Sequence, residues 1–255
     1  MTRTLRERGL LRRLTAAAVL LVAGCATVPP LEPIVRIEGE EERIESYLAA
    51  ARRDASERRA VRAVGKLSLE SPNGSGNVRE VIVVERPNRL RLEALNLLGQ
   101  TQVLLVADGE RFAFFDGSRL ERGPLSDDIL RDHLGIDLAP AEAIDLLLAA
   151  PRIPEGPALG VLGQGTDRIA RLDSQIVRFG ADGELRGVAS LDPAGLPRWS
   201  VEYASWRDAG AGRYPFSVVF SFPRLATRAE LRVREAELNP ELDTSLFDVP
   251  LGPSD

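Results

Sequence analysis

The feature that most constrains the fold is an alternation of apolar and polar residues that runs through most of the chain. Leu67 and Leu69 lie between Lys66, Ser68 and Glu70, and later segments repeat this period of two. Such a pattern places the apolar side chains on one face of a strand. Only short turns separate the segments, so helical crossovers do not fit between them and the strands are expected to be antiparallel.

Helical spacing interrupts this pattern in two places. Ile44 and Leu48 belong to an amphipathic helix before the first strand, and Ile144, Leu147 and Leu148 share one face of a helix in the middle of the chain, where a shorter helix precedes it. The prediction is a mainly β fold with few helices (α+β), made of about ten or eleven antiparallel strands. A sheet of that size must curl or close. We therefore expect an apolar concave face that the helices cover.

The first 24 residues have the composition of an export signal. Five arginines precede a short apolar run, which is shorter than the roughly 20 residues that a membrane span needs. The run ends in Leu21-Val22-Ala23-Gly24-Cys25, which resembles the lipobox of bacterial lipoproteins. This resemblance implies a signal peptide at 1–24, acyl chains on Cys25, a lipidated tether at 25–41 and a single domain at 42–255. The alternative is an ordinary signal peptide, with Cys25 at the lipobox position by chance.

The residue after Cys25 is Ala26, not the aspartate that retains enteric lipoproteins in the inner membrane. The lipoprotein resemblance therefore implies an outer-membrane location, lipid-anchored through Cys25 and facing the periplasm. The formal net charge is −5, and removal of the arginine-rich signal makes the remainder more acidic. An acidic body argues against nucleic acid as a partner. We expect a monomer.

The sequence offers little material for catalysis. His133 is the only histidine and Cys25 the only cysteine, so metal clusters built from these residues are excluded. His133 lies in a predicted helix, where it is expected to be an ordinary polar residue. No phosphate-binding or dinucleotide-binding glycine motif is present. We expect neither an enzyme nor a cofactor.

The stretch from Arg89 to Pro151 resembles the LolB family, whose members receive lipoproteins from the periplasmic carrier LolA and insert them into the outer membrane. In that family a strand ends in an Asn-Pro-Leu-Gly-like loop with a protruding leucine. Here the loop is Asn96-Leu97-Leu98-Gly99, so Leu98 matches that leucine and Leu97 replaces the proline. A departure is Ala149-Ala150-Pro151, where the family helix usually ends in Gly-x-Pro.

The resemblance implies an open antiparallel half-barrel with a helical lid over a cavity for acyl chains, and a membrane-insertion loop at Leu97 and Leu98. The residues it places around the cavity are Leu67, Leu69, Leu90, Leu92, Phe112, Phe114, Ile144, Leu147 and Leu148. The alternative for Leu97 and Leu98 is a pair of core leucines at a strand end, against which Asn96 and Gly99 mark a turn, and turns lie on the surface. The other nine residues could form a solid β core.

The function expected from these observations is that of an outer-membrane lipoprotein that binds acyl chains and receives and inserts other lipoproteins. Its partners would be the outer-membrane bilayer, acylated lipoproteins and a periplasmic LolA-like carrier. Two alternatives stay open at this point. One is a carrier or sensor of other lipids on the same fold, and the other is an envelope interaction lipoprotein with a solid core.

Overall fold

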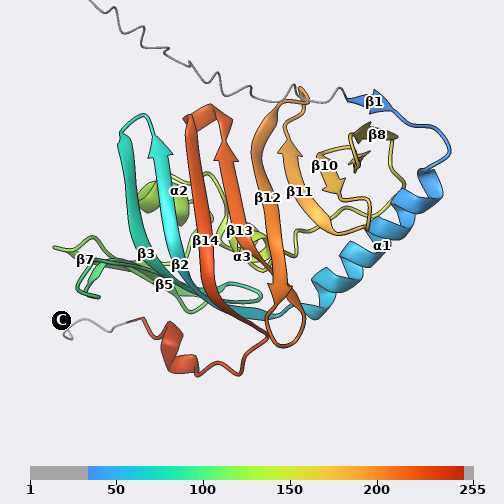
Figure 1. Ribbon diagram of the computed structural model, residues 1–255. Helices are drawn as coiled ribbons and strands as arrows, with labels where there is room; N and C mark the ends of the chain where they lie inside the picture. Colours follow the sequence, from blue (N-terminus) through green and yellow to red (C-terminus); the bar gives the residue numbers. More distant parts are fainter. Residues whose placement is uncertain (1–33, 250–255) are drawn as a thin grey trace, which may run out of the picture. The chain divides into compact units, whose positions relative to one another are not determined.

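The computed structural model describes residues 34–249, shown as a ribbon in Figure 1. Three α-helices are present in this part of the chain: α1 (Glu41–Glu57), α2 (Ile129–Leu134) and α3 (Pro140–Leu147). The strands of the first half are β1 (Val35–Arg36), β2 (Ala60–Ser71), β3 (Gly74–Glu85), β4 (Arg89–Leu95), β5 (Thr101–Ala107), β6 (Arg111–Phe115) and β7 (Leu120–Pro124). Those of the second half are β8 (Gly160–Gln164), β9 (Asp167–Arg171), β10 (Gln175–Phe179), β11 (Leu185–Leu191), β12 (Pro197–Asp208), β13 (Arg213–Phe222) and β14 (Thr227–Leu238).

All these strands form one antiparallel sheet in the order β1-β8-β9-β10-β11-β12-β13-β14-β2-β3-β4-β5-β6-β7. The sheet consists of two meanders, β2–β7 and β8–β14, which are joined where β14 pairs with β2 along most of their lengths. Strands β1 and β7 are the two edges and do not pair with each other, so the sheet is open. The predicted open antiparallel half-barrel is confirmed.

The sheet has 14 strands, more than the ten or eleven expected. Strands β1, β7 and β8 account for the difference. They have only two to five residues, and their sequences show little alternation of apolar and polar side chains. The first of them also changes the boundary of the predicted tether. Val35–Arg36 pairs with Leu162 and Gly163 of β8, so residues 35–36 belong to the sheet. Residues 1–33, which include the predicted signal peptide and Cys25, lie outside the described residues.

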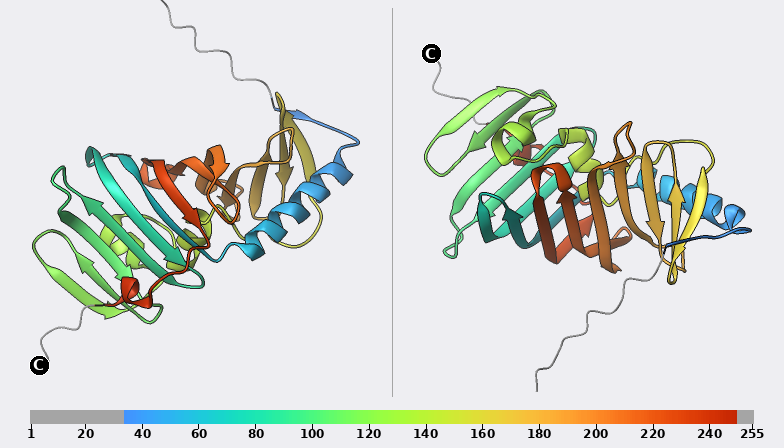
Figure 2. Two further views of the ribbon diagram at one scale, coloured as in Figure 1. Left: turned by 60° about the horizontal axis from the view of Figure 1, so that its bottom comes forward. Right: turned by 90° about the horizontal axis from the view of Figure 1, so that it is seen from above.

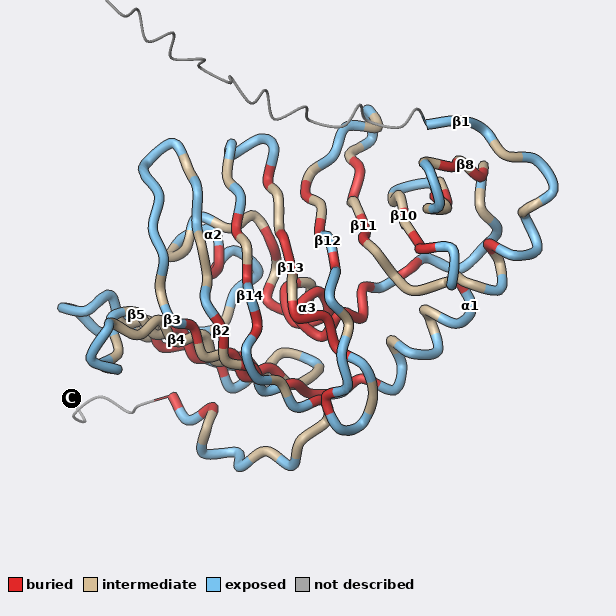
Figure 3. The backbone as a smooth tube through the Cα atoms, viewed as in Figure 1, coloured by how far each residue is buried: buried red, intermediate tan, exposed pale blue. Residues whose placement is uncertain are grey.

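The sheet curves around α2 and α3, which lie on its concave side (Figures 1 and 2). Apolar side chains from both meanders and all three helices form one continuous core on this side. Helix α1 contributes Ile44 and Leu48, both fully buried, which confirms its predicted amphipathic face. In Figure 3 the tube through α3 is buried along almost its whole length. The helical pair is therefore the centre of the core as well as a lid.

Side chains from distant parts of the chain bind the carbonyl groups at the C-terminal end of α3. The hydroxyl of Tyr203 donates to Leu146 O at 2.9 Å, and that of Tyr214 donates to Leu147 O at 2.7 Å. The guanidinium of Arg58 donates to Leu148 O at 3.1 Å. The last carbonyls of a helix have no partner within the helix. Here they are satisfied although they are buried.

The residue that follows the C-cap of α3 has a left-handed backbone. Ala149 has φ +51°, and its N–H donates to Leu146 O, while the N–H of Ala150 donates to Asp145 O. Glycine is the usual residue in this conformation, since it has no Cβ to strain. This is the position where the LolB family usually has the glycine of Gly-x-Pro. The departure therefore changes the residue type and retains a helix end of the kind that glycine favours.

A second, smaller apolar cluster lies on the convex side. The chain after β14 crosses the outer face of β3–β6, where Phe247 is 1% exposed and packs with Val83, Val106 and Ala113. Because both faces of these strands are covered here, the alternation of burial along β3 disappears from Ile82 to Val84. The C-terminal segment thus shields the half of the sheet that carries the loop after β4.

Replacement of Tyr214 by phenylalanine should lower the free energy of unfolding by about 1–3 kcal/mol, because Leu147 O would lose its partner inside the core. Chemical denaturation of the purified domain measures this change. Tyr47→Phe is the matched control, since Tyr47 donates to Ala181 O from a half-exposed position. We expect the control to change stability by less than about 1 kcal/mol. Equal effects for the two variants would contradict the role given to the α3 carbonyls.

Candidate functional site

The concave face is the candidate site, and it carries the residues that the sequence assigned to an acyl-chain cavity. Eight of the nine belong to a single apolar cluster between the sheet and the helices. The buried members are Leu90, Phe112, Ile144, Leu147 and Leu148, and the partly buried ones are Leu67, Leu92 and Phe114. Leu69 is separate, with 37% of its surface exposed. The structure thus brings together residues from β2, β4, β6 and α3.

Burial falls steadily from one end of this face to the other. Along β2, exposure rises from 0% at Val61 to 2% at Ala63 and 37% at Leu69, whose side chains share the concave face. Val78, opposite Leu67, and Phe220 of β13 are also only partly buried. Helix α3 fills the end near Val61, whereas the end near the β2–β3 turn is open. We call this second part the open end of the concave face.

The histidine of α2 lies against the aromatic residues of β6. The ring centroid of His133 is 4.5 Å from that of Phe114 and 5.3 Å from that of Phe112, and its Nε2 is 3.9 Å from Glu121 Oε1. The imidazole therefore covers the apolar surface of the two rings. Within residues 34–249, no group of three or more His, Cys, Asp or Glu side chains is arranged to hold a metal ion. In the same range no helix is long and apolar enough to cross a bilayer.

Glu80 of β3 is a buried carboxyl group among the apolar residues that β2–β4 place on this face. Its residue is 6% exposed, and it lies opposite Gly65 of β2 and Ala94 of β4. Burial, with a smaller contribution from the charge of Glu93, raises the pKa of Glu80 to about 8. Glu80 is not among the site residues predicted from the sequence. The available signal was its inward position in the alternation of β3, between Val78 and Ile82.

The loop between β4 and β5 holds two apolar side chains in solvent. Leu97 and Leu98 have relative exposures of 106% and 84%. The side-chain oxygen of Asn96 accepts hydrogen bonds from the N–H groups of Leu98 and Gln100, both at 2.9 Å. Gly99 closes the turn with φ +79°, and its N–H donates to Asn96 O. The loop is ordered by its polar residues, and packing plays no part in holding the two leucines. They are not core residues.

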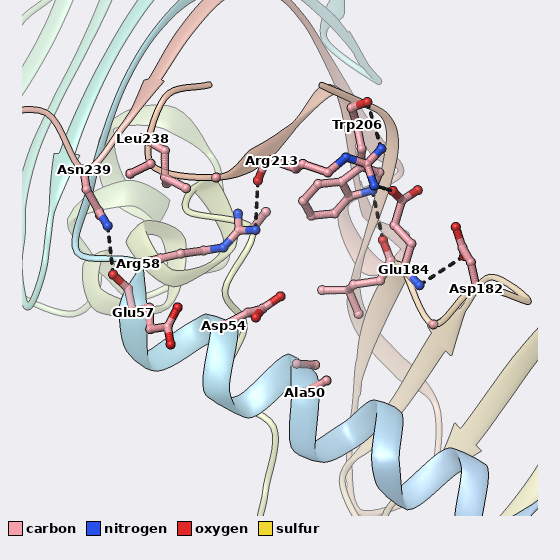
Figure 4. A pocket seen from close by; sticks show the side chains of 16 residues that line it. Ala50, Asp54, Glu57, Arg58, Asp182, Glu184, Trp206, Arg213, Leu238 and Asn239 are labelled. Carbon is pink, nitrogen blue, oxygen red and sulfur yellow. Dashed lines mark hydrogen bonds and ion pairs between the residues drawn. The ribbon is translucent and has the colours of Figure 1, made fainter. Parts of the chain in front are cut away.

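A pocket of about 430 Å³ lies elsewhere, beside the C-terminal half of α1 (Figure 4). Its charged lining includes Asp54, Glu57 and Asp182, and the guanidinium of Arg58 lies 5.4 Å from the ring centroid of Trp206. None of the nine predicted cavity residues lines this pocket. Segments far apart in the sequence form it, which is why the sequence did not reveal it. Its carboxylates are a poor match for an acyl chain.

No protein-family model matches the sequence, and no curated protein matches it. Solved structures do match in fold. A LolA superfamily protein from Nitrosomonas europaea aligns with a TM-score of 0.54 and 11% sequence identity, over 79% of this chain and 97% of that chain. A putative outer membrane lipoprotein-sorting protein domain from Vibrio parahaemolyticus aligns with a TM-score of 0.52 and 10% identity, over 80% and 97%. A DUF1329 family protein from Desulfovibrio piger gives 0.54 and 7%, also over 80% and 97%.

The chain has the LolA-type fold. At sequence identities of 7–11%, the likeness is one of fold alone. The LolA-type fold accounts for the grouping of the predicted cavity residues, because its curved sheet turns one face of every strand toward the helices. The resemblance to LolB in particular still depends on the sequence of the β4–β5 loop.

The buried carboxyl gives a pH-dependent prediction. In the folded state the pKa of Glu80 is about 8, against an ordinary value of 4.5. The folded state therefore keeps a proton that the unfolded chain releases, and its stability falls as the pH rises from 4.5 to about 8. Glu80→Gln removes this loss. Its stability relative to wild type should increase by about 3 kcal/mol between pH 4.5 and 7, at about 1.4 kcal/mol per pH unit.

Denaturant titrations at a series of pH values measure this difference. Glu70→Gln is the control, because Glu70 is an exposed carboxylate on the convex face of β2. The free energy of unfolding of the control should differ from that of wild type by the same amount at every pH. A Glu80→Gln curve that is also parallel to wild type would mean that Glu80 titrates normally in the folded protein.

Proposed function

We propose that this protein is an outer-membrane lipoprotein that binds acyl chains on its concave face and inserts acylated lipoproteins into the membrane. The observation that carries the proposal is the pair of solvent-exposed leucines, Leu97 and Leu98, on an ordered loop. A soluble domain gains no stability from two such side chains in water. They gain free energy when they enter an apolar layer.

The position of this loop in the sheet supports a coupling between membrane contact and the concave face. The loop connects β4 and β5, and these strands supply Leu90, Leu92 and Leu105 to the concave apolar cluster. An acyl chain that leaves this face near the loop would move from one apolar environment to another. Such a transfer needs no cofactor and no chemical step. Direction would come from the difference in affinity between the donor carrier, this protein and the bilayer.

The proposal includes an anchor and a donor. Acyl chains on Cys25 would hold the domain at the outer membrane, because two or more chains anchor stably whereas one does not. The lipobox-like sequence Leu21–Cys25 supports this part. The donor would be a periplasmic carrier of the LolA type, and the fold neighbours, a LolA superfamily protein and a putative outer membrane lipoprotein-sorting protein domain, support that choice.

Leu98→Glu should separate the two halves of the activity. Because Leu98 is exposed, we expect the variant to change the free energy of unfolding by less than about 0.5 kcal/mol. Acceptance of a lipoprotein from a carrier should continue, while release into liposomes should fall at least about tenfold, since a carboxylate resists entry into the apolar layer. The double change at Leu97 and Leu98 should reduce release further.

The measurement is the transfer of a labelled lipoprotein into sedimented liposomes. A matched control is Leu196→Glu, which changes another strongly exposed leucine, 61% exposed, in the β11–β12 turn. Release should be normal in this control. If release by Leu98→Glu is unimpaired, the loop has no insertion role and the assignment to lipoprotein insertion fails.

Cys25→Ser should abolish acylation, because no other cysteine is available to accept a diacylglyceryl group. Metabolic labelling with a palmitate analogue, followed by immunoprecipitation, measures this loss. In a parallel membrane fractionation, the Cys25→Ser variant should no longer be found in the outer-membrane fraction. Equal labelling of wild type and variant would rule out Cys25 as the anchor.

A further inference from the structure

Glu80 is the polar group of the concave face that the proposed function leaves unexplained. Its cross-strand neighbours are Gly65 and Ala94, the two smallest kinds of side chain, and the next residues on the same face of β3 are Val78 and Ile82. No other ionisable group shares these positions. The carboxyl group is therefore a single polar point on an apolar wall.

This carboxyl group has no partner within the part of the chain that the structure describes. No hydrogen bond or ion pair joins Glu80 to any residue of 34–249, although the residue is only 6% exposed. The side-chain atoms that are completely enclosed and unpaired belong to Arg52, Arg122 and Gln175. The Glu80 oxygens are not among these atoms, so they retain some accessible surface. A buried polar group without a partner costs stability, and in native proteins such a group calls for an explanation.

The surroundings of Glu80 indicate the kind of partner that it lacks. One side of it is the packed core, with Ile82 4% exposed. The other side is the open end of the concave face, where Leu67 and Val78 are only partly buried. A ligand that fills the open end must be largely apolar and must present a polar atom near the middle of β3. An acyl chain with its carbonyl group has this arrangement.

The protonation state of Glu80 selects between hydrogen-bond donor and acceptor. Because its pKa is raised to about 8, the group is mostly the neutral acid at pH 7. A neutral carboxylic acid has one O–H to donate. An ester or amide carbonyl oxygen is an acceptor, and it is the polar atom directly attached to an acyl chain.

We propose that Glu80 donates a hydrogen bond to the acyl carbonyl oxygen of a bound lipid, so that the concave face binds acyl esters and amides in preference to plain hydrocarbon chains. This inference rests on the proposed function, since it places the acyl ligand on the same face. It adds a polar anchor and a defined depth for the chain. The same carbonyl chemistry occurs in the acylated N-terminus of a lipoprotein and in a phospholipid.

The test compares two fluorescent probes that differ in one group. Both probes carry the same pyrene-labelled chain and the same head group. An ester links the chain to the head group in one probe, and an ether links them in the other. The protein is the full-length chain with Cys25→Ser, which has no acyl chain of its own. We expect it to bind the ester about five to ten times more tightly than the ether, the usual range for one hydrogen bond.

Three further variants in this background locate the preference. Glu80→Gln retains an N–H donor and should keep the preference for the ester, whereas Glu80→Leu has no donor and should bind the two probes equally. Glu70→Leu on the convex face should behave as the parent chain does. Thermal unfolding of each variant confirms that it is folded. The inference is overturned if Glu80→Leu still prefers the ester, or if Glu80→Gln loses the preference as the leucine variant does.

Competition with the bound ester probe separates the two sources of the carbonyl group. One competitor is a synthetic triacylated cysteine peptide, and the other is phosphatidylethanolamine. Displacement by the peptide, weakened in Glu80→Leu, supports both the hydrogen bond from Glu80 to the acyl carbonyl and lipoprotein transfer. Displacement by the phospholipid alone supports the hydrogen bond from Glu80 and overturns lipoprotein transfer. If neither probe binds saturably to the parent chain, the proposed function itself fails.

Discussion

The satisfaction of the C-terminal carbonyls of α3 is the interaction on which the rest of the structure depends. Tyr203, Tyr214 and Arg58 bind the oxygens of Leu146, Leu147 and Leu148, and Arg86 donates to Ala150 O at 2.8 Å. The two tyrosines belong to β12 and β13, whereas Arg58 precedes β2 and Arg86 follows β3. Each meander thus holds the same helix end. Because unpaired carbonyls in a core are costly, the two halves of the sheet are fixed around α3 in one arrangement.

Ion pairs to α3 reinforce the contact between this helix end and the sheet. Asp145 of α3 is 3% exposed, and its two carboxylate oxygens accept from Arg86 at 2.7 Å and from Arg152 at 2.6 Å. A buried carboxylate with two arginine partners is compensated, and loss of one partner would leave charge in the core. This pairing contrasts with Glu80, which lies on the same concave side and has no partner. The first carboxyl group stabilises the fold, whereas the second is available for a ligand.

The fixed position of α3 also gives the concave face its two unequal ends. Near the helix the strands are packed, and toward the β2–β3 turn they expose apolar side chains such as Leu69. A sheet without the helix would expose its whole inner face, and a closed barrel would expose none of it. The open sheet with one filled end supplies a graded apolar surface. The β4–β5 loop, held by Asn96, adds an apolar point outside that surface.

Sequence alone determined the class of fold, because the period of two and the short turns permit little besides an antiparallel sheet. It also identified the β4–β5 loop, since Asn96 and Gly99 form a turn through local hydrogen bonds that need no tertiary partner. The short edge strands could not be found in this way. Pairs such as Val35–Arg36 with β8 exist only because the two segments meet in space.

Tertiary structure decided what the alternation leaves undetermined. An apolar inward position has the same sequence signature whether it is packed against α3, as Leu90 is, or partly open, as Leu67 is. Which of the two applies depends on where α3 lies, and partners from Arg58 to Tyr214, far apart in the chain, set that position. The raised pKa of Glu80 has the same origin, since desolvation depends on every segment that surrounds the group.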